Sequence, residues 1–221
     1  MFGKRENLKY TKNSTEEEEE EEVPEAVNDA TTDSFLSMLN DDLGKTFGLY
    51  GEVNEENCRV VISHLYALRN SGRFTIGDNE EEGCEPMEMI ISTEGGHVTE
   101  MFAVYDVMQQ IKRECEIHTI GLGKVMSAGV LLLASGTKGY RKVGKHCRLM
   151  LHSIAGGDFG SIRQLENNIK EVKWYQTSYI DALSQNSQMS TRQLKAIFRK
   201  KSDTYFDANQ ALKWGIVDEI I

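Results

Sequence analysis

The segment "GKVMSAGVLLLASG", residues 123–136, combines a run of apolar side chains with a single hydroxyl at the start of the run. The apolar run predicts a buried helix, and serine is a favoured N-cap because its hydroxyl accepts a hydrogen bond from an unpaired backbone N–H. Ser127 is therefore either the cap of a buried helix or a reactive group where a strand passes into that helix. The neighbouring segments decide between these two interpretations.

The segments around this one alternate between strand-like and helix-like patterns. Strands are expected at 47–53, 87–93, 117–123 and 147–154, each followed by a helix whose apolar residues recur every three or four positions. The longest helix is expected at 161–184. This alternation predicts an α/β domain with a largely parallel sheet. The acidic stretch 77–86 is expected to be an exposed loop.

Two shorter helices close the chain. Each begins with a capping box, formed by Ser190 with Gln193 and by Asp207 with Gln210. Gly215 is expected to end the last helix in a left-handed conformation, which a residue without a Cβ adopts at little cost.

Composition limits the number of domains and the class of partner. A chain of 221 residues with 39% hydrophobic content is long enough for one sizeable core. The seven consecutive glutamates Glu16–Glu22 repel one another, so residues 1–23 are expected to be a disordered acidic tail. A net charge of −10 argues against a nucleic-acid partner, whose binding surface would be basic.

The location and the metal content are also constrained. No apolar run approaches the roughly 20 residues of a membrane span, and the first residues lack the apolar core of a secretory signal. We therefore expect a cytoplasmic protein without a membrane partner. The four cysteines have no metal-ligand spacing, so they are expected to be reduced packing residues, and no metal is expected.

Polar or glycine signals mark three points where a strand passes into a helix. Gly95 and Gly96 follow one strand, Ser127 and Ala128 follow a second, and His152 ends a third, 25 residues beyond the serine. A serine, a histidine and exposed backbone N–H groups are the parts of a nucleophilic acyl-transfer site. The sequence therefore predicts Ser127 as nucleophile, His152 as base, and the N–H groups of Gly96 and Ala128 as the oxyanion hole.

These segments resemble the ClpP family, the proteolytic subunits of the Clp protease. "GKVMSAGVLLLASGTKGYR" resembles the family's nucleophile segment, and "RLMLHSIAGGDFG" resembles its histidine segment at the same interval. "ISTEGGHVTEMFAVYDVMQQIK" resembles its oxyanion segment and following helix. Its first strand and helix are matched by "LYGEVNEENCRVVISHLYALRN", and its closing helix and strand by "ANQALKWGIVDEII". The match covers residues 43–221.

The resemblance implies a fold and an assembly. The fold would be the ClpP/crotonase-like spiral of strand and helix units, with the helix 161–184 protruding as a handle. Subunits would form stacked seven-membered rings, and an AAA+ unfoldase would use ATP to feed in unfolded polypeptides, so that this chain needs no cofactor. Residues 24–42 would be a candidate axial or docking region. Tyr175 and Tyr179 are placed either at subunit contacts or in the core.

The chain departs from the family pattern at two places. The aspartate that orients the family's histidine is replaced by Lys200 or, counted from Ala208, by Arg199. Both side chains are donors only and cannot accept the histidine N–H bond. Asp203 is therefore the candidate substitute in the triad, with Ser202 or a backbone carbonyl as a weaker one. Glu94 stands where the family has a proline.

Three functions follow from these residues. The first is a serine endopeptidase of Clp type that uses Ser127, His152 and Asp203. The second is a catalytically weak or silent ring subunit, because the usual aspartate is missing. The third is an acyl-CoA enzyme related to the crotonases, a class that typically relies on carboxylates for acid–base work and does not need this serine–histidine interval.

Overall fold

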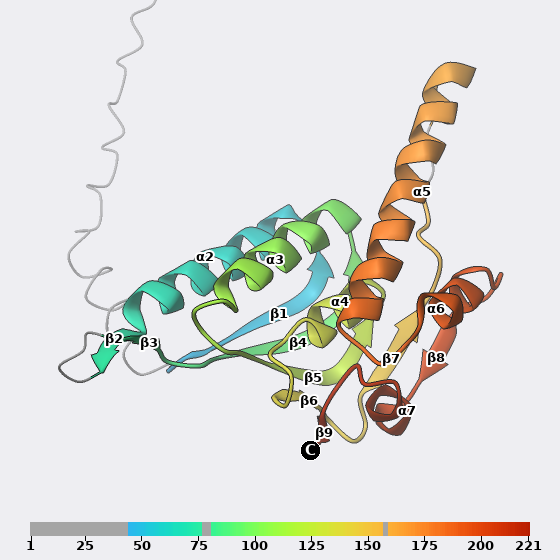
Figure 1. Ribbon diagram of the computed structural model, residues 1–221. Helices are drawn as coiled ribbons and strands as arrows, with labels where there is room; N and C mark the ends of the chain where they lie inside the picture. The colour runs from blue at the N-terminus through green and yellow to red at the C-terminus, as the bar shows by residue number, and fades with distance from the viewer. Residues whose placement is uncertain (1–43, 77–80, 157–158) are drawn as a thin grey trace, which may run out of the picture. The chain divides into compact units, whose positions relative to one another are not determined.

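The computed structural model describes residues 44–76, 81–156 and 159–221 of the chain (Figure 1). They belong to the unit formed by residues 43–221. The acidic tail expected at 1–23 and the segment 24–42 lie outside the described residues, so both remain predictions.

The main sheet has seven strands, and most of its pairings are parallel. Its principal order is β1-β4-β5-β6-β9, with β7 paired to β5 and β8 antiparallel to β7. The bounds are β1 Thr46–Val53, β4 Met87–Gly96, β5 Ile117–Met126, β6 Arg141–Val143, β7 Arg148–Leu151, β8 Thr204–Phe206 and β9 Glu219–Ile220. The predicted α/β class with a mostly parallel sheet is confirmed.

Strand β5 is the centre of this sheet and bends within it. Residues 119–121 pair with β6, whereas residues 124–126 pair with β7. The change of partner coincides with a register shift against β4 and with Gly123, which has a φ of 65°. The sheet therefore divides at β5, and the end of β5 lies beside β7.

Six helices are described. They are α2 Glu55–Ser71, α3 Val98–Ile111, α4 Ala128–Ala134, α5 Ile162–Gln185, α6 Thr191–Phe198 and α7 Ala208–Lys213. Helices α2 and α3 lie side by side over β1 and β4, and α5 extends away from the sheet (Figure 1). The predicted capping box is present at Ser190, and Gly215 has the predicted positive φ. At Asp207 only half of the predicted capping box is present, the hydrogen bond from the Gln210 N–H to the Asp207 side chain.

The core is built from the faces that the periodicity predicts. Cys58, Val61 and Leu65 of α2 are buried, and every residue of α4 is buried. Helix α5 is different, because only residues in its last third are buried: Tyr179, Ile180, Ala182 and Leu183. The N-terminal two-thirds of α5 remains largely exposed in the single chain.

The expectation of a loop is wrong for residues 81–84, and the expectation of reduced cysteines is wrong for Cys84 and Cys115. Residues Glu81–Cys84 form strand β3, which pairs antiparallel with β2, Arg73–Ile76, so this part of the segment 77–86 is a strand and not a loop. Residues 77–80 lie outside the described residues. Cys84 and Cys115 form a disulfide between β3 and the segment after α3, while Cys58 and Cys147 are buried free thiols. The cysteines lie 31 residues apart in sequence, and only the tertiary fold brings them together.

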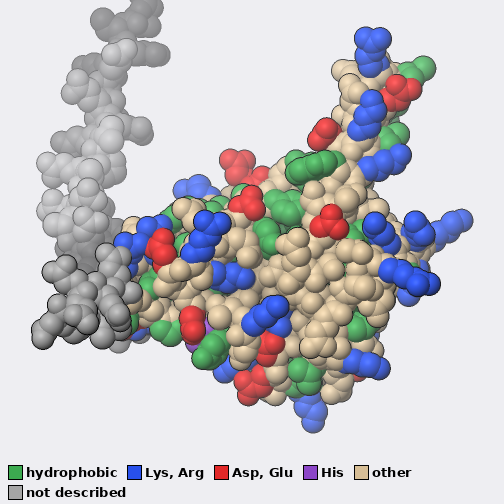
Figure 2. All heavy atoms as spheres, viewed as in Figure 1, with side chains coloured by type: hydrophobic (Ala, Val, Ile, Leu, Met, Phe, Trp, Pro, Cys, Tyr) green, Lys and Arg blue, Asp and Glu red, His purple; other side chains and the backbone are tan. Residues whose placement is uncertain are grey.

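The surface carries a basic region over α6. Arg192, Lys195, Arg199, Lys200 and Lys201 are all exposed, and Figure 2 shows Lys and Arg side chains gathered there. None of the helices in the described part of the chain is long and apolar enough to cross a bilayer.

Candidate active site

Ser127 occupies a strained turn between β5 and α4. Its φ of 53° makes it the only non-glycine residue with a positive φ in the described ranges. Such a conformation costs on the order of 1–3 kcal/mol and persists only when its surroundings hold it. The Ser127 N–H donates to the Met150 carbonyl at 2.8 Å, which ties the turn to β7.

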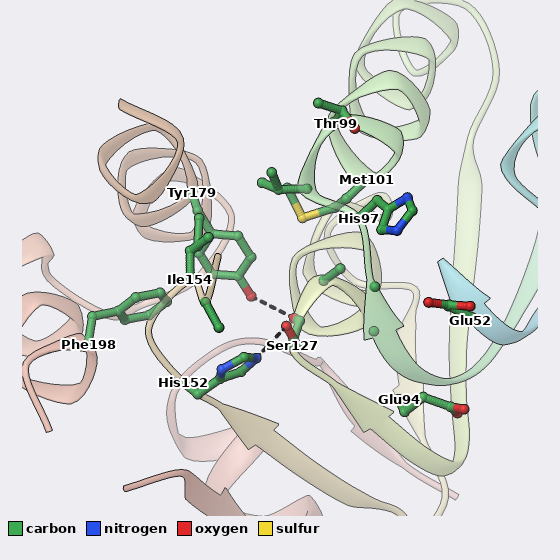
Figure 3. A pocket seen from close by; sticks show the side chains of 15 residues that line it. Glu52, Glu94, His97, Thr99, Met101, Ser127, His152, Ile154, Tyr179 and Phe198 are labelled. Atoms are coloured by element: carbon green, nitrogen blue, oxygen red, sulfur yellow. Dashed lines mark hydrogen bonds between the residues drawn. The ribbon is translucent and has the colours of Figure 1, made fainter. Parts of the chain in front are cut away.

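The hydroxyl of Ser127 does not cap helix α4. Ser127 is the N-cap residue, but its side chain makes no capping hydrogen bond. Instead, Ser127 Oγ lies 2.8 Å from His152 Nε2. The cap explanation of this serine therefore does not account for its side chain, which is directed at the histidine (Figure 3).

The sheet brings this serine and histidine together. Strands β5 and β7 run parallel with Met126 opposite Met150, so both chains leave the sheet at the same edge. Ser127 follows β5 directly, and His152 is the first residue after β7. Side chains that follow adjacent parallel strands meet at the carboxyl edge of the sheet, where active sites of open α/β folds commonly lie.

The glycine pair at the end of β4 approaches the serine closely. Gly95 and Gly96 have φ values of 98° and 152°. A Cβ at Gly95 would stand 2.7 Å from Ser127 Cβ, and one at Gly96 would stand 2.3 Å from the Val53 carbonyl oxygen. Side chains at these positions would collide with backbone or with the serine, so the positions require glycine.

A cleft of about 670 Å³ surrounds the serine and histidine. Gly96 and Ala128, the two predicted oxyanion residues, both line it. Figure 3 shows Ile154, Tyr179 and Phe198 on one side of Ser127, and Glu52, Glu94 and His97 on the other. The site thus combines a serine, a histidine, a glycine turn and a helix start in one cleft with an apolar side and a polar side.

Glu94 belongs to the polar side of the cleft. Its carboxylate lies 2.6 Å from Lys124 Nζ, and both side chains are about half exposed. The side-chain hydrogen bond from Lys124 lowers the pKa of Glu94, so the carboxylate stays charged at neutral pH. An exposed pair of this kind contributes little stability, and its effect is to place charge at the cleft.

Asp203 is not joined to His152. Strand β8 pairs antiparallel with β7, with Thr204 opposite Leu151. Asp203, which precedes β8, and His152, which follows β7, therefore lie at the same end of this strand pair. The Asp203 side chain is nevertheless exposed, and within the described ranges no hydrogen bond or ion pair links it to the imidazole. Lys200 is also exposed, and its Nζ lies 3.5 Å from Thr204 Oγ1.

Two residues that support the site were not predicted from the sequence. Thr93 is buried, and its hydroxyl donates to the Gly51 carbonyl while accepting the Gly95 N–H at 2.9 Å. The Tyr179 hydroxyl donates to the Ser127 carbonyl at 2.8 Å. In each of these hydrogen bonds the partner is a backbone atom, so the partner's side chain carries no signal in the sequence.

The part of the chain that the structure describes holds no cluster of three or more His, Cys, Asp or Glu side chains placed to bind a metal ion. The oxygen and nitrogen groups in the cleft are those of the serine, the histidines and the two glutamates, together with Thr99, Tyr179 and the backbone.

Comparison with known proteins gives a consistent assignment. The sequence profile of the family described as "Clp protease" matches residues 28–221. The chain is 29% identical over 173 residues to "ATP-dependent Clp protease proteolytic subunit 1" of Borreliella burgdorferi, covering 78% of this chain and 82% of the relative. It is 30% identical over 170 residues to "ATP-dependent Clp protease proteolytic subunit 2" of Thermobifida fusca, covering 77% of each. With this fold and this profile match, the chain belongs to the Clp protease family.

Proposed function

We propose that this chain is a proteolytic subunit of an ATP-dependent Clp-type protease and that it hydrolyses peptide bonds with Ser127 and His152. The observation that carries the proposal is the 2.8 Å approach of Ser127 Oγ to His152 Nε2 inside the cleft. That distance is within the reach that proton transfer from a nucleophile to its base requires.

The reaction follows from these positions. Ser127 Oγ attacks the peptide carbonyl while His152 Nε2 takes the hydroxyl proton. The N–H groups of Gly96 and Ala128 stabilise the oxyanion of the tetrahedral intermediate. The C–N bond then breaks, His152 returns the proton to the leaving amine, and water hydrolyses the acyl-enzyme by the same steps with His152 as base.

The proposed mechanism uses a serine–histidine pair without Asp203. The exposed Asp203 carboxylate makes no bond to His152 among the described residues. Loss of the third member of a triad can cost about 10⁴ in turnover, so we expect a slower enzyme than a complete triad would give. Oxyanion stabilisation and substrate binding account for the catalysis that remains.

The assembly is part of the same proposal. The relatives are named as subunits of an ATP-dependent protease, which supports stacked rings of this chain, an unfoldase partner that consumes ATP, and unfolded polypeptides as substrates. The exposed apolar residues of α5 support contacts between subunits. A cytoplasmic location remains a prediction.

A second candidate function is a silent ring subunit. The observation that favours it is the basic side chain at Lys200 or Arg199, together with an imidazole whose only hydrogen-bond partner among the described side chains is Ser127. Such a subunit would keep the fold and the subunit contacts but would not turn over peptide substrates.

Peptide hydrolysis separates the two functions. A fluorogenic peptide is incubated with the purified full chain, with Ser127→Ala and with Ser153→Ala as the matched control, since Ser153 is the neighbouring serine but does not line the cleft. We expect hydrolysis by the wild type and by Ser153→Ala and none by Ser127→Ala. Equal rates for Ser127→Ala and the wild type would contradict the proposed nucleophile.

A further inference from the structure

We propose that Tyr179 is a positioning residue, which holds the peptide group between Ser127 and Ala128 so that the Ala128 N–H is aimed at the oxyanion. The inference rests on the proposed function and assigns a role in that reaction to a residue of α5. It is carried by one contact, the hydrogen bond from the Tyr179 hydroxyl to the Ser127 carbonyl at 2.8 Å (Figure 3).

The bonded carbonyl and the proposed oxyanion donor belong to the same peptide group. The carbonyl is that of Ser127, and the N–H of this group is that of Ala128. The six atoms of a trans peptide group are coplanar, and its C=O and N–H point in opposite directions. A donor that fixes the direction of the carbonyl therefore also fixes the direction of the N–H.

This peptide group has particular need of an anchor because it follows the strained residue. Ser127 has a φ of 53° and a ψ of −117°. Its N–H is held by Met150, and its carbonyl is held by Tyr179 and, at 3.0 Å, by the Val130 N–H. Tyr179 is the only side chain among these three partners, so it is the partner that substitution can remove.

The environment of Tyr179 suits this role. The side chain is 4% exposed, and its ring packs against Phe198 with centroids 5.4 Å apart. Burial raises the pKa of the phenol far above its usual range, so the hydroxyl remains protonated. It is therefore a permanent donor to the Ser127 carbonyl, and donation to a carbonyl also strengthens the N–H of the same peptide group as a donor.

Tyr179→Phe is the variant that tests this role. It keeps the ring and its contact with Phe198 and removes only the hydroxyl, and the Ser127 carbonyl keeps its bond from Val130. Tyr175→Phe is the matched control, because Tyr175 lies one turn earlier on α5, packs on Phe102 and does not line the cleft. Both variants are made in the full chain.

The first measurement separates transition-state from ground-state effects. For Tyr179→Phe we expect kcat for a fluorogenic peptide to fall about tenfold with little change in KM, as for loss of one hydrogen bond that aligns an oxyanion donor. Inhibition by the corresponding peptide aldehyde, whose adduct with Ser127 carries the oxyanion, is expected to weaken by a similar factor. Tyr175→Phe is expected to keep the wild-type values.

A purely structural role would give a different pattern. Unchanged kcat and aldehyde inhibition in Tyr179→Phe, with only a lower melting temperature, would overturn the proposal. So would an equal loss of kcat in Tyr175→Phe, because that would indicate a general effect of helix α5.

A crystal structure of Tyr179→Phe tests the inference without relying on activity. We expect the plane of the Ser127–Ala128 peptide to rotate away from its wild-type orientation, and an unchanged plane would overturn the positioning role. A wild-type protein that neither cleaves peptides nor forms the aldehyde adduct would instead overturn the proposed function, while the crystal structure would still decide the role of Tyr179.

Discussion

Single residues at the strand ends determine what this site can do. Ser127 holds a backbone conformation that L-residues rarely adopt, and its hydroxyl faces an imidazole rather than the helix that it begins. Strain of this kind is typical of functional sites, where the surrounding structure holds it. Among the described side chains, none accepts a hydrogen bond from His152 as the third residue of a triad would.

The first prediction concerns Asp203. Because its carboxylate is exposed and makes no described bond to His152, we expect Asp203→Asn to change kcat by less than about threefold. This change in kcat would be far smaller than the roughly 10⁴-fold loss that removal of an aspartate bonded to the histidine can cause. The measurement is the steady-state rate of peptide hydrolysis, with light scattering to show that the assembly is unchanged.

Restoring the acceptor is the complementary test. Lys200→Asp introduces a carboxylate at one of the two positions where the resemblance would place the triad aspartate, and it is expected to raise kcat severalfold. Lys201→Asp makes the same charge change at an adjacent exposed site and should not raise kcat. A hundredfold loss in Asp203→Asn would show that this carboxylate reaches the histidine in the working enzyme.

The sequence could predict the parts of the site that follow strands directly. Ser127, His152, Gly95 and Gly96 each stand at a strand end, and parallel strands bring such positions to one edge. The role of Tyr179 could not be predicted this way, because its hydroxyl belongs to an apolar stripe of a helix and meets the serine carbonyl 52 residues away. A side chain that bonds only to backbone leaves no pattern in its partner's sequence.

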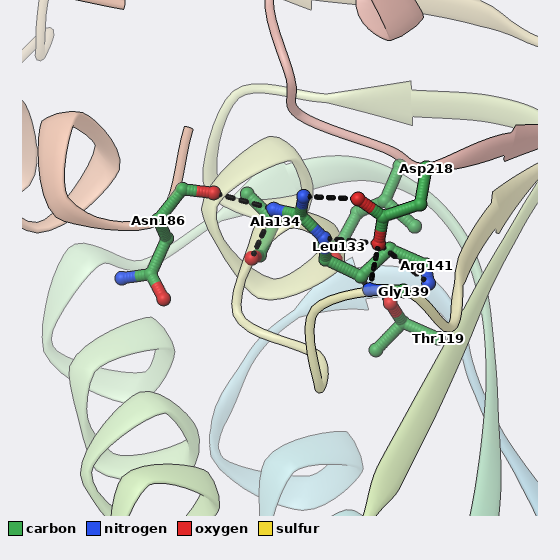
Figure 4. A network of polar contacts seen from close by, with 7 residues as sticks. All are labelled: Thr119, Leu133, Ala134, Gly139, Arg141, Asn186 and Asp218. Carbon is green, nitrogen blue, oxygen red and sulfur yellow. Dashed lines mark hydrogen bonds and ion pairs between the residues drawn. The ribbon is translucent and has the colours of Figure 1, made fainter. Parts of the chain in front are cut away.

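At the scale of elements, the edge of the sheet is held by a buried arginine. Arg141 at the start of β6 is 4% exposed, and its guanidinium makes two bonds to the Asp218 carboxylate, 2.8 Å from Nε and 2.6 Å from Nη2 (Figure 4). Its remaining nitrogen donates to the carbonyls of Ala134 and Asn186. One side chain thus joins β6, the segment before β9, the end of α4 and the end of α5.

The second prediction concerns Asp218. Burial would raise the pKa of its carboxyl, but the hydrogen bonds from Arg141 outweigh burial and lower it. Asp218→Asn leaves a buried guanidinium without its counter-charge. We expect a loss of about 2–3 kcal/mol in the free energy of unfolding at pH 7, which is less than for a fully buried pair because Asp218 is partly exposed. Urea denaturation measures it.

The pH dependence of this loss has a definite sign. A carboxyl whose pKa is lowered on folding contributes stability above its unfolded pKa of about 4, and that contribution fades as pH falls through the lower folded value. The difference between wild type and Asp218→Asn should therefore shrink below about pH 4. Glu219→Gln removes an exposed ion pair in which Glu219 Oε2 lies 3.7 Å from Lys142 Nζ. This variant should lower the free energy of unfolding by less than about 0.5 kcal/mol. A pH-independent difference would contradict the account.

Periodicity predicted the positions of the helices and of strands β1, β4, β5 and β7, although α5 buries only the last third of its apolar stripe. It failed at β3, where "EEGC" has no apolar alternation and is a strand only because β2 pairs with it. It also failed for Cys84 and Cys115, since pairing depends on how the segment after α3 packs beside β3. Local sequence patterns do not predict contacts between segments that are distant in the chain.

At the scale of the whole molecule, helix α5 exposes three large apolar side chains. Ile162, Ile169 and Trp174 are 78%, 53% and 59% exposed. Apolar groups exposed in this way along one element typically mark an interface. The proposed rings would bury these residues against neighbouring subunits.

The third prediction is that these residues hold the assembly together. Ile162→Glu combined with Ile169→Glu is expected to give particles of lower mass than the wild type in light scattering at micromolar concentration, because charges would replace buried apolar contacts. Asn167→Glu, on the same exposed part of α5, is the control for added charge and should keep the wild-type mass. A wild-type protein that is monomeric would contradict the proposed assembly.

Covalent labelling of Ser127 tests the central proposal most directly. The full chain is treated with a fluorophosphonate, digested and analysed by mass spectrometry, alongside Ser127→Ala and His152→Ala. We expect a stable adduct on Ser127 in the wild type, because the proposed base His152 lies 2.8 Å from the hydroxyl. We expect no adduct in Ser127→Ala and strongly slowed labelling in His152→Ala. Absence of labelling in the wild type, or labelling at the same rate without His152, would contradict the account.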